Sequence, residues 1–522
     1  MRLKVSAAQR DSALLVSMTS PRLLQMRSDA AAIDVLLRSG PAVCALMLGL
    51  MWGAGTNVLL RVPILVVAGV LAVWWLFRSP NIHRPATVLI VVWSISFAGF
   101  FSGVVTPLAH WPLTAAHAYL VAALLCVVGG SHWASRMTSI RRPSAPVILN
   151  QIVVDIFAAA GLVSTVLFMY EMLVLNSVDL SDMSGTRLAF QMRDATVYSY
   201  IELLTRPGAV IALCVVIVFW EVINPLRRFL YAVSGISLAL QGVASAGRFT
   251  ILLIFMVMVY AFGLRRARGL PMLPGFLVKA GAVCVFTVLG AYIFYVSATR
   301  SVGSFENAPY RYFLLSSGTE INHDVMRAGF EELPMWVRTA IVSSYSYLAL
   351  PIGHFAVFWN VYQGEPAWGA LEYPLVSRNL ARLELPVPNP NDVLEERFSE
   401  FQSYGEPAYT WQTAVRDSVV DFGVWGALLA AFVFGVILQN TYQKVITQGE
   451  LGSLVVGLSW WMVAVHSPLY SIAGEPTMFI LLLTGYGLKT GSWRFGRSKR
   501  ALHFAAGEIS APAHRNSRLT FS

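Results

Sequence analysis

Apolar residues fill most of this chain in closely spaced runs of about twenty residues, separated by short polar segments. A helix of that length rises about 30 Å, the thickness of the hydrocarbon core of a bilayer. The runs are continuous and do not alternate, which favours helices over a β-barrel. They predict twelve transmembrane spans, at 41–60, 62–77, 85–105, 112–130, 147–174, 207–225, 229–247, 249–263, 276–298, 416–440, 451–469 and 473–490. The predicted fold class is an all-α polytopic membrane protein.

One polar interval is much longer than the others. Between about Arg300 and Thr413 the sequence has no clean apolar run of bilayer length, and it is rich in Arg, Asp, Glu, Tyr, Trp and Pro. Apolar and aromatic stretches within 322–358 predict short helices at the membrane surface. The chain therefore divides into an N-terminal tail at 1–40, nine spans at 41–298, a loop subdomain at 299–415, three spans at 416–490 and a basic tail at 491–522.

Basic residues gather in alternate connecting segments, which predicts the orientation. These segments are the two tails and those containing Arg84, Arg142, Arg228 and Arg266. With twelve spans they all fall on one side, and the positive-inside rule makes that side the cytoplasm, with both termini there. The long loop then lies on the other side. Because basic clusters flank 229–263, that segment is predicted to be a hairpin of two short helices.

Composition adds limits on function. Of the 522 residues 56% are hydrophobic and 13% charged, about half the charged fraction of an ordinary soluble domain. The net charge of +10 is explained by topology, so we expect no nucleic-acid partner. The four cysteines lie in apolar runs without a CxxC spacing. The chain has no P-loop, GxGxxG, HExxH or GxSxG motif, and we expect neither a cofactor nor a metal.

Several polar residues are candidates for chemistry. In the predicted hairpin turn, Arg248 would begin a helix, where an arginine and free backbone N–H groups favour a phosphate. The alternative is an arginine whose head reaches the lipid headgroups. Asp421 lies inside an apolar run. It is either a catalytic carboxylate or an acid that is stabilised by the N-terminus of a helix. Two carboxylates within spans, Asp155 and Glu221, fit an ion relay or a polar contact between helices equally well.

Two short elements resemble a known family. The Ser-Ala-Gly-Arg248 turn before an apolar helix is one, and the run Tyr409-Thr410 … Asp421-Phe-Gly … Gly435 is the other. Both, with the overall topology, resemble the bacterial oligosaccharide repeat-unit polymerases, or O-antigen polymerases of the Wzy type. The chain departs from some members in lacking an Arg-x(10)-Gly pattern, and Pro407-Ala408 stands where some have Asn.

The resemblance implies a GT-C-like glycosyltransferase of the bacterial inner membrane. It would polymerise repeat units carried on undecaprenyl pyrophosphate at the periplasmic face, among membrane lipids and with a chain-length regulator as a candidate partner. The implied site residues are Asp421, Glu406 and His323 as candidates for the base, Arg248, Arg300 and Arg311 for the pyrophosphate, and Tyr409 and Arg416 for the acceptor sugar.

Two other functions remain open at this point. The first is an O-antigen ligase, which transfers finished glycan to a lipid core and in which His323 or His354 would act. The second is a polysaccharide or small-molecule transporter or flippase, for which repeat symmetry between two halves would be expected. No internal repeat of fixed period is visible in the sequence.

Overall fold

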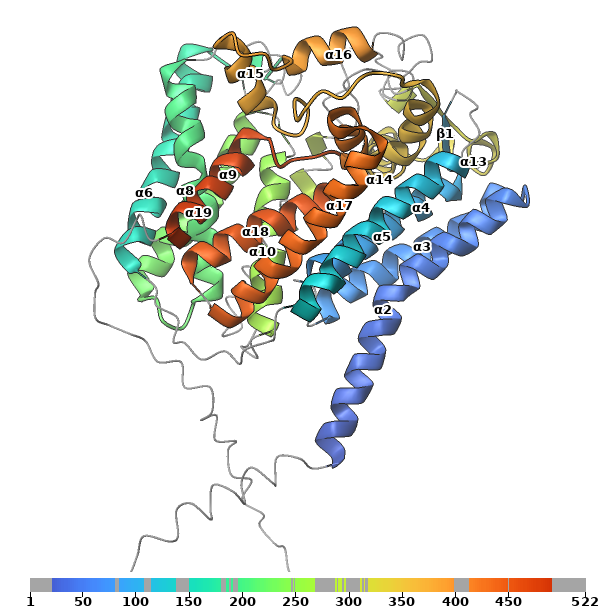
Figure 1. The fold of residues 1–522 in the computed structure, drawn as a ribbon, viewed down its shortest axis with the longest axis horizontal. Coiled ribbons are helices and arrows are strands. Elements are labelled where there is room, and N and C mark those ends of the chain that lie inside the picture. The colour runs from blue at the N-terminus through green and yellow to red at the C-terminus, as the bar shows by residue number, and fades with distance from the viewer. Residues whose placement is uncertain are drawn as a thin grey trace, which may run out of the picture.

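The computed structural model describes residues 21–79, 84–107, 114–137, 150–179, 196–267 except 246 and 248, 318–398 and 413–490 except 449, with isolated residues within 185–190 and 287–314. Almost all of them are helical (Figure 1). The helices of the first half are α2 (Pro21–Gly53), α3 (Val58–Arg78), α4 (Pro85–Ser102), α5 (Thr114–Met137), α6 (Gln151–Tyr170), which continues as the π-helix η1 (Glu171–Leu175), α8 (Val197–Val218), α9 (Pro225–Ala244) and α10 (Phe249–Ala267).

The second half holds shorter elements before three further long ones. They are α13 (His323–Arg327), the 3-10 turn η2 (Phe330–Glu332), α14 (Met335–Val361), α15 (Pro374–Arg382), α16 (Pro390–Phe398), α17 (Ala414–Gln448), α18 (Leu451–His466) and α19 (Pro476–Thr490). Two short strands, β1 (Val105–Pro107) and β2 (Thr319–Ile321), pair antiparallel with Thr106 opposite Glu320. This pair ties the start of the second half to the end of α4.

The chain is a multi-pass α-helical membrane protein by the length and composition of its helices. Eight described helical segments are long and apolar enough to cross a bilayer: α3, α4, α5, α6 with η1, α8, α10, α14 and α17. Every predicted span except 276–298, most of which lies outside the described residues, overlaps a described helix. The number of crossings, twelve in our prediction, stays a prediction.

Successive long helices run in opposite directions, so the bundle has two distinct ends. At one end, called here the strand end, α4 finishes, α5 begins and β1 lies between them (Figure 1). At the other, the basic end, Arg227 donates to Asp155 on α6 at 2.8 Å and Arg265 pairs with Glu221. The two carboxylates therefore form polar contacts between neighbouring elements, which is one of the two interpretations that the sequence left open.

The predicted hairpin at 229–263 is confirmed. Helix α9 ends at Ala244 and α10 begins at Phe249, so the segment is two helices. A β-carbon on Gly242 would come within 2.8 Å of Ile251, which shows how closely the two helices approach beside the turn. Both flanking arginine clusters consequently lie at the basic end of the bundle.

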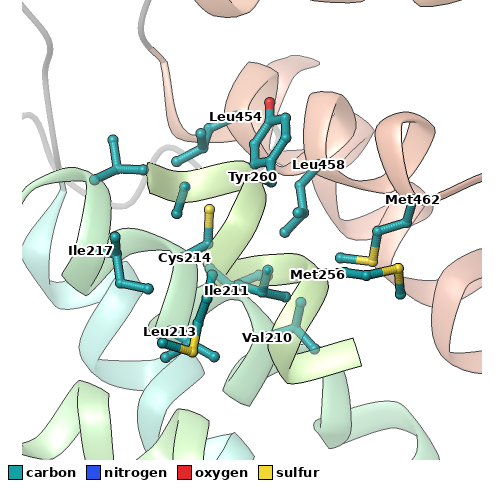
Figure 2. Close-up of a cluster of buried hydrophobic side chains, with 14 of the residues drawn as sticks. Val210, Ile211, Leu213, Cys214, Ile217, Met256, Tyr260, Leu454, Leu458 and Met462 are labelled. Atoms are coloured by element: carbon teal, nitrogen blue, oxygen red, sulfur yellow. The ribbon is translucent and has the colours of Figure 1, made fainter. Parts of the chain in front are cut away.

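The bundle core is continuous and apolar. Side chains of α8 (Val210, Ile211, Cys214, Ile217) meet those of α10 (Met256, Tyr260) and α18 (Leu454, Leu458, Met462), as Figure 2 shows. These residues are buried. A helix that is apolar on all sides can be buried in the middle of such a bundle, and α8 has almost no exposed residue between Pro207 and Phe219.

Glycines allow α5 and α17 to approach closely. A β-carbon on Gly130 of α5 would lie 2.1 Å from the Phe432 carbonyl oxygen of α17, and one on Gly435 would lie 2.0 Å from the Val127 carbonyl oxygen. Ser131 Oγ also donates to the Gly435 carbonyl at 3.0 Å. Small residues at such contacts let helix backbones meet in a membrane. In this way Gly435 holds α17 against α5.

Gly130→Ala is expected to destabilise the folded protein by about 1–3 kcal/mol, because the new methyl group meets a backbone oxygen that cannot move alone. The matched control is Gly129→Ala on the same helix, where an added β-carbon meets nothing within 4 Å. That change should be neutral or slightly stabilising, since alanine favours the helix. Thermal unfolding of the purified protein in detergent compares the two, and equal midpoints would contradict the close contact.

Helix α14 corrects one expectation. The sequence predicts no apolar run of bilayer length between 300 and 413, yet α14 has 27 residues and is apolar enough to cross a membrane. Hydropathy alone does not reveal this helix, because Arg338, several serines and His354 interrupt its apolar pattern. Tyr345 of α14 donates to the Gly99 carbonyl at 2.5 Å, and the Trp359 ring lies 4.4 Å from that of Tyr119.

The contacts of α14 also define its course. Gly99 lies one turn before the end of α4, and Tyr119 lies in the second turn of α5. Residues 345 and 359 are about 21 Å apart along a helix, yet both touch the strand end of the bundle. Helix α14 therefore lies across the strand ends of α4 and α5.

Two helices begin well before the predicted spans that they contain. Helix α2 begins at Pro21, inside the predicted tail at 1–40, and its first half projects away from the bundle (Figure 1). Helix α8 begins at Val197, ten residues before the predicted start, because Thr196 forms a capping box with Ser199. Pro207, the expected helix start, lies inside α8.

Candidate functional site

A loop at the strand end is fixed to α17 through Asp421. This anchored loop, residues 367–373, connects the segment after α14 to α15. Both carboxylate oxygens of Asp421 accept the backbone N–H of Leu371 at 3.1 Å, and Oδ2 accepts that of Glu372 at 2.7 Å. The Trp368 N–H donates to the Asp421 carbonyl at 2.9 Å. Asp421 is fully buried, so it positions the loop rather than facing solvent.

The anchored loop presents the carboxyl group of Glu372. Oε1 accepts from Ser418 Oγ at 2.6 Å, and Oε2 accepts from Ser471 Oγ. Burial raises the pKa of Glu372 to about 7, and the nearby negative charge of Asp417 adds to the effect. A carboxyl group with a pKa near neutrality can both take and give a proton under physiological conditions. Glu372 is therefore the best placed acid–base group among the described residues.

A buried ion pair lies beside Glu372. Arg416 Nε and Nη2 donate to Asp417 Oδ1 at 2.9 and 2.6 Å, and both side chains are almost fully covered. Asp417 Oδ2 accepts the Ser471 N–H at 3.2 Å. Ser471 thus contacts both carboxyl groups, one through its hydroxyl and one through its backbone. The pair leaves Arg416 neutralised within the protein.

The segment between α18 and α19 encloses the site together with the anchored loop and the start of α17. The Ala414 N–H donates to the Ser467 carbonyl at 2.9 Å, which joins the start of α17 to the end of α18. A β-carbon on Gly474 would lie 2.2 Å from the Glu372 carbonyl oxygen, so only glycine fits there. The acid–base group is consequently enclosed by three segments from distant parts of the chain.

Aromatic side chains stand at the open side of the anchored loop. Trp368 is 76% exposed, and its φ of 53° is unusual for a bulky residue. Tyr373, next to Glu372, is 37% exposed. Strained backbone and exposed large aromatic rings beside a titratable carboxyl group are typical of a binding site.

A second polar cluster adjoins the first. Arg206 of α8 donates to Glu202 at 2.7 Å and to Thr477 Oγ1 at 3.3 Å. Glu475 caps the start of α19 by accepting the Thr477 N–H at 3.0 Å. The positive charge of Arg206 also acts on the buried Glu475 carboxyl group. This cluster ties α8 to the segment that carries Ser471.

Of the four sequence-predicted site residues that the structure describes, two lie in the site around Glu372, Asp421 and Arg416. His323 is exposed at the start of α13, and Arg311 is exposed and pairs with Glu331. No hydrogen bond or ion pair within the described ranges joins either of them to Glu372. The remaining candidates, Arg248, Arg300, Glu406 and Tyr409, lie outside the described residues. His354, which with His323 is one of the two histidines that a ligase would use, is buried in α14.

Sequence reasoning missed Glu372. It lies in a polar interval with many other charges and belongs to no motif, so its sequence neighbours give little signal. Its special environment comes from Ser418 and Ser471, which are 46 and 99 residues away. The one local signal is that Glu372 and Tyr373 directly precede Pro374, the first residue of α15.

Within the described ranges, no group of three or more His, Cys, Asp or Glu side chains could hold a metal ion. Comparison of the chain with protein-family models, with curated proteins and with solved structures gives no significant match. The functional argument therefore rests on the residues of the site.

The stability of the folded protein should fall as the pH rises from about 4.5 to about 7. In the unfolded chain Glu372 ionises near 4.5, whereas the folded protein holds its proton up to about 7. The folded state thus binds more protons than the unfolded state over that interval. The free energy of unfolding should fall by about 3 kcal/mol as a result. Thermal unfolding across this pH range measures the effect. The loss should be smaller by about that amount in Glu372→Gln, and an unchanged pH dependence in that variant would contradict the assignment.

Proposed function

We propose that the protein is a membrane glycosyltransferase that polymerises undecaprenyl-pyrophosphate-linked oligosaccharide repeat units at the periplasmic face of a bacterial inner membrane. The observation that carries the proposal is Glu372, a carboxyl group with a pKa near 7 held at one end of a multi-spanning bundle. Acid–base groups with pKa values near the working pH are most effective in proton transfer.

The orientation of the bundle supports a site outside the cytoplasm. Arg227, Arg265 and Arg266 lie at the basic end, and the positive-inside rule assigns that end to the cytoplasm. The anchored loop lies at the opposite, strand end with the start of α17. In this orientation Glu372 meets substrates that arrive from the outer leaflet.

The proposed reaction uses Glu372 as the base. Its carboxylate takes the proton from a hydroxyl group of the acceptor sugar, and the hydroxyl oxygen forms a bond to the anomeric carbon of the donor. The bond between that carbon and the pyrophosphate oxygen breaks, and the electron pair leaves with the pyrophosphate. Arginine side chains neutralise this leaving group. Arg248, Arg300 and Arg311 remain the candidates, and Arg311 would exchange its present partner Glu331.

The acceptor sugar would contact the aromatic residues of the anchored loop. Trp368 and Tyr373 are exposed on either side of Glu372 in the sequence. Their rings offer flat apolar faces of the kind that pack against the C–H face of a sugar. Arg416, proposed from the sequence to hold the sugar, is bound to Asp417 and acts in this scheme by balancing the charge near Glu372.

Removal of the protein from its host distinguishes the candidate functions. Cells that lack a polymerase should carry single repeat units on their surface glycolipid in place of long chains. Free polymer that is not attached to a lipid core would instead indicate a ligase. Unchanged surface polysaccharide of normal chain length would refute both glycosyl-transfer functions and a polysaccharide flippase, and would leave a small-molecule transporter as the remaining candidate.

A further inference from the structure

Arg61 is a buried cation near the strand end of the membrane bundle. It lies in the first turn of the apolar helix α3, and only 7% of the residue is exposed. Its Nη1 donates to the Phe101 carbonyl near the end of α4 at 2.9 Å. Its guanidinium lies 4.9 Å from the centre of the Trp52 ring. No ion pair with a carboxylate among the described residues balances its charge.

The guanidinium is held in a defined position with unused donors. Nε is completely covered and has no hydrogen-bond acceptor within the part of the chain that the structure describes. A β-carbon on Gly103 would lie 2.7 Å from the Trp52 ring and 3.1 and 3.2 Å from Nη1 and Nη2, so the backbone of Gly103 packs against both side chains. Gly103 adopts a φ of 70°, which favours glycine there. Trp52, Gly103 and the Phe101 carbonyl therefore fix the position of the cation.

A buried arginine without a counter-charge is costly at membrane depth and is usually paired. The Phe101 carbonyl satisfies one of its five N–H donors, and that contact also suits the negative end of α4. The N–H groups of Nη2 and the second N–H of Nη1 are the donors that can bind a phosphate group in a bidentate way. An arginine that only reaches for the headgroups would instead extend its charged end into solvent.

The surroundings indicate a lipid as the source of the phosphate. Leu59 and Leu60, next to Arg61, are exposed, as are Leu46 and Leu50 on α2. These apolar side chains face the region occupied by acyl chains in a helix that spans the membrane. Arg61 lies one turn inside the end of α3, close to the depth at which lipid phosphates begin.

We propose that Arg61, with Trp52, forms a binding site for the phosphate group of an anionic membrane lipid in the leaflet at the strand end. This site is separate from Glu372 and does not depend on the proposed glycosyl transfer. It would hold the α2–α3 hairpin and the end of α4 at a fixed position in the leaflet.

The test uses the purified full-length protein in nanodiscs of phosphatidylcholine with increasing fractions of phosphatidylglycerol. The melting midpoint of the unaltered protein should rise with phosphatidylglycerol. In Arg61→Gln the lipid fraction that gives half of the maximal rise should increase at least about tenfold, and Arg61→Lys should be intermediate because it keeps the charge but loses the planar fork. Each midpoint is compared with that of the same variant in pure phosphatidylcholine, which separates lipid binding from a change in intrinsic stability.

Arg84→Gln is the matched control, because Arg84 lies over the Tyr442 ring at the other end of the bundle. It should respond to phosphatidylglycerol as the unaltered protein does. An equal response of Arg61→Gln and the unaltered protein would overturn the proposal. A rise produced by inorganic phosphate alone, and lost in Arg61→Gln, would overturn the assignment to a lipid.

Discussion

Glu372→Gln is expected to abolish long-chain polymer while the protein remains folded. Glutamine keeps the shape of the side chain and can still bond to Ser418 and Ser471, but it cannot take a proton from an acceptor hydroxyl. Loss of a general base typically lowers the rate by about two to four orders of magnitude. Surface polysaccharide from complemented cells, separated on gels, measures chain length, and membrane levels of the protein measure folding.

The control for this change is Glu332→Gln. Glu332 is an exposed carboxylate in η2 and takes no part in the site around Glu372. This variant should produce chains of normal length. Normal chain lengths in Glu372→Gln, at normal protein levels, would remove Glu372 from the catalytic scheme.

Asp421→Ala is expected to affect stability and activity together. The change leaves the backbone N–H groups of Leu371 and Glu372 without their acceptor in a covered site, and each such loss costs about 1–3 kcal/mol. We therefore expect a loss of about 2–5 kcal/mol in the free energy of unfolding. Release of the anchored loop would also misplace Glu372. Thermal unfolding and proteolysis within 362–373 report the two effects.

Asp421→Asn separates the structural role from a chemical one. Its amide oxygen can still accept one backbone N–H, so stability and activity should be partly retained. Asp392→Ala provides the baseline, since Asp392 is exposed on α16. An Asp421→Ala protein as stable as that baseline, with a loop equally resistant to proteolysis, would disprove the anchoring role.

Most helices of the membrane bundle were predictable, because an apolar run or a basic cluster is formed by residues that are neighbours in the sequence. The hairpin at 229–263 followed from the positions of Arg227 and Arg265 alone, and the structure confirms it. Helix ends were less predictable. Thr196 starts α8 ahead of Pro207, and this depends on a capping interaction with Ser199 that hydropathy does not reveal.

The candidate site was only partly predictable, since it depends on contacts across long sequence separations. Asp421 was identified as an unusual carboxylate in an apolar run, but the sequence could not show that its oxygens are occupied by Leu371 and Glu372. The interruption of α17 at Gly423, which has a φ of 71°, and the close contact with α5 at Gly435 also became visible only in the structure.

The central claim is that Glu372 is the base of a glycosyl-transfer reaction. The most direct measurement is the rate of polymer formation by the purified protein on undecaprenyl-pyrophosphate-linked repeat units between pH 5 and pH 8, for the unaltered protein and Glu372→Gln. The rate should rise with pH as Glu372 loses its proton near pH 7, and Glu372→Gln should be about two to four orders of magnitude slower without that rise. A Glu372→Gln protein with the rate and pH profile of the unaltered protein would contradict the account.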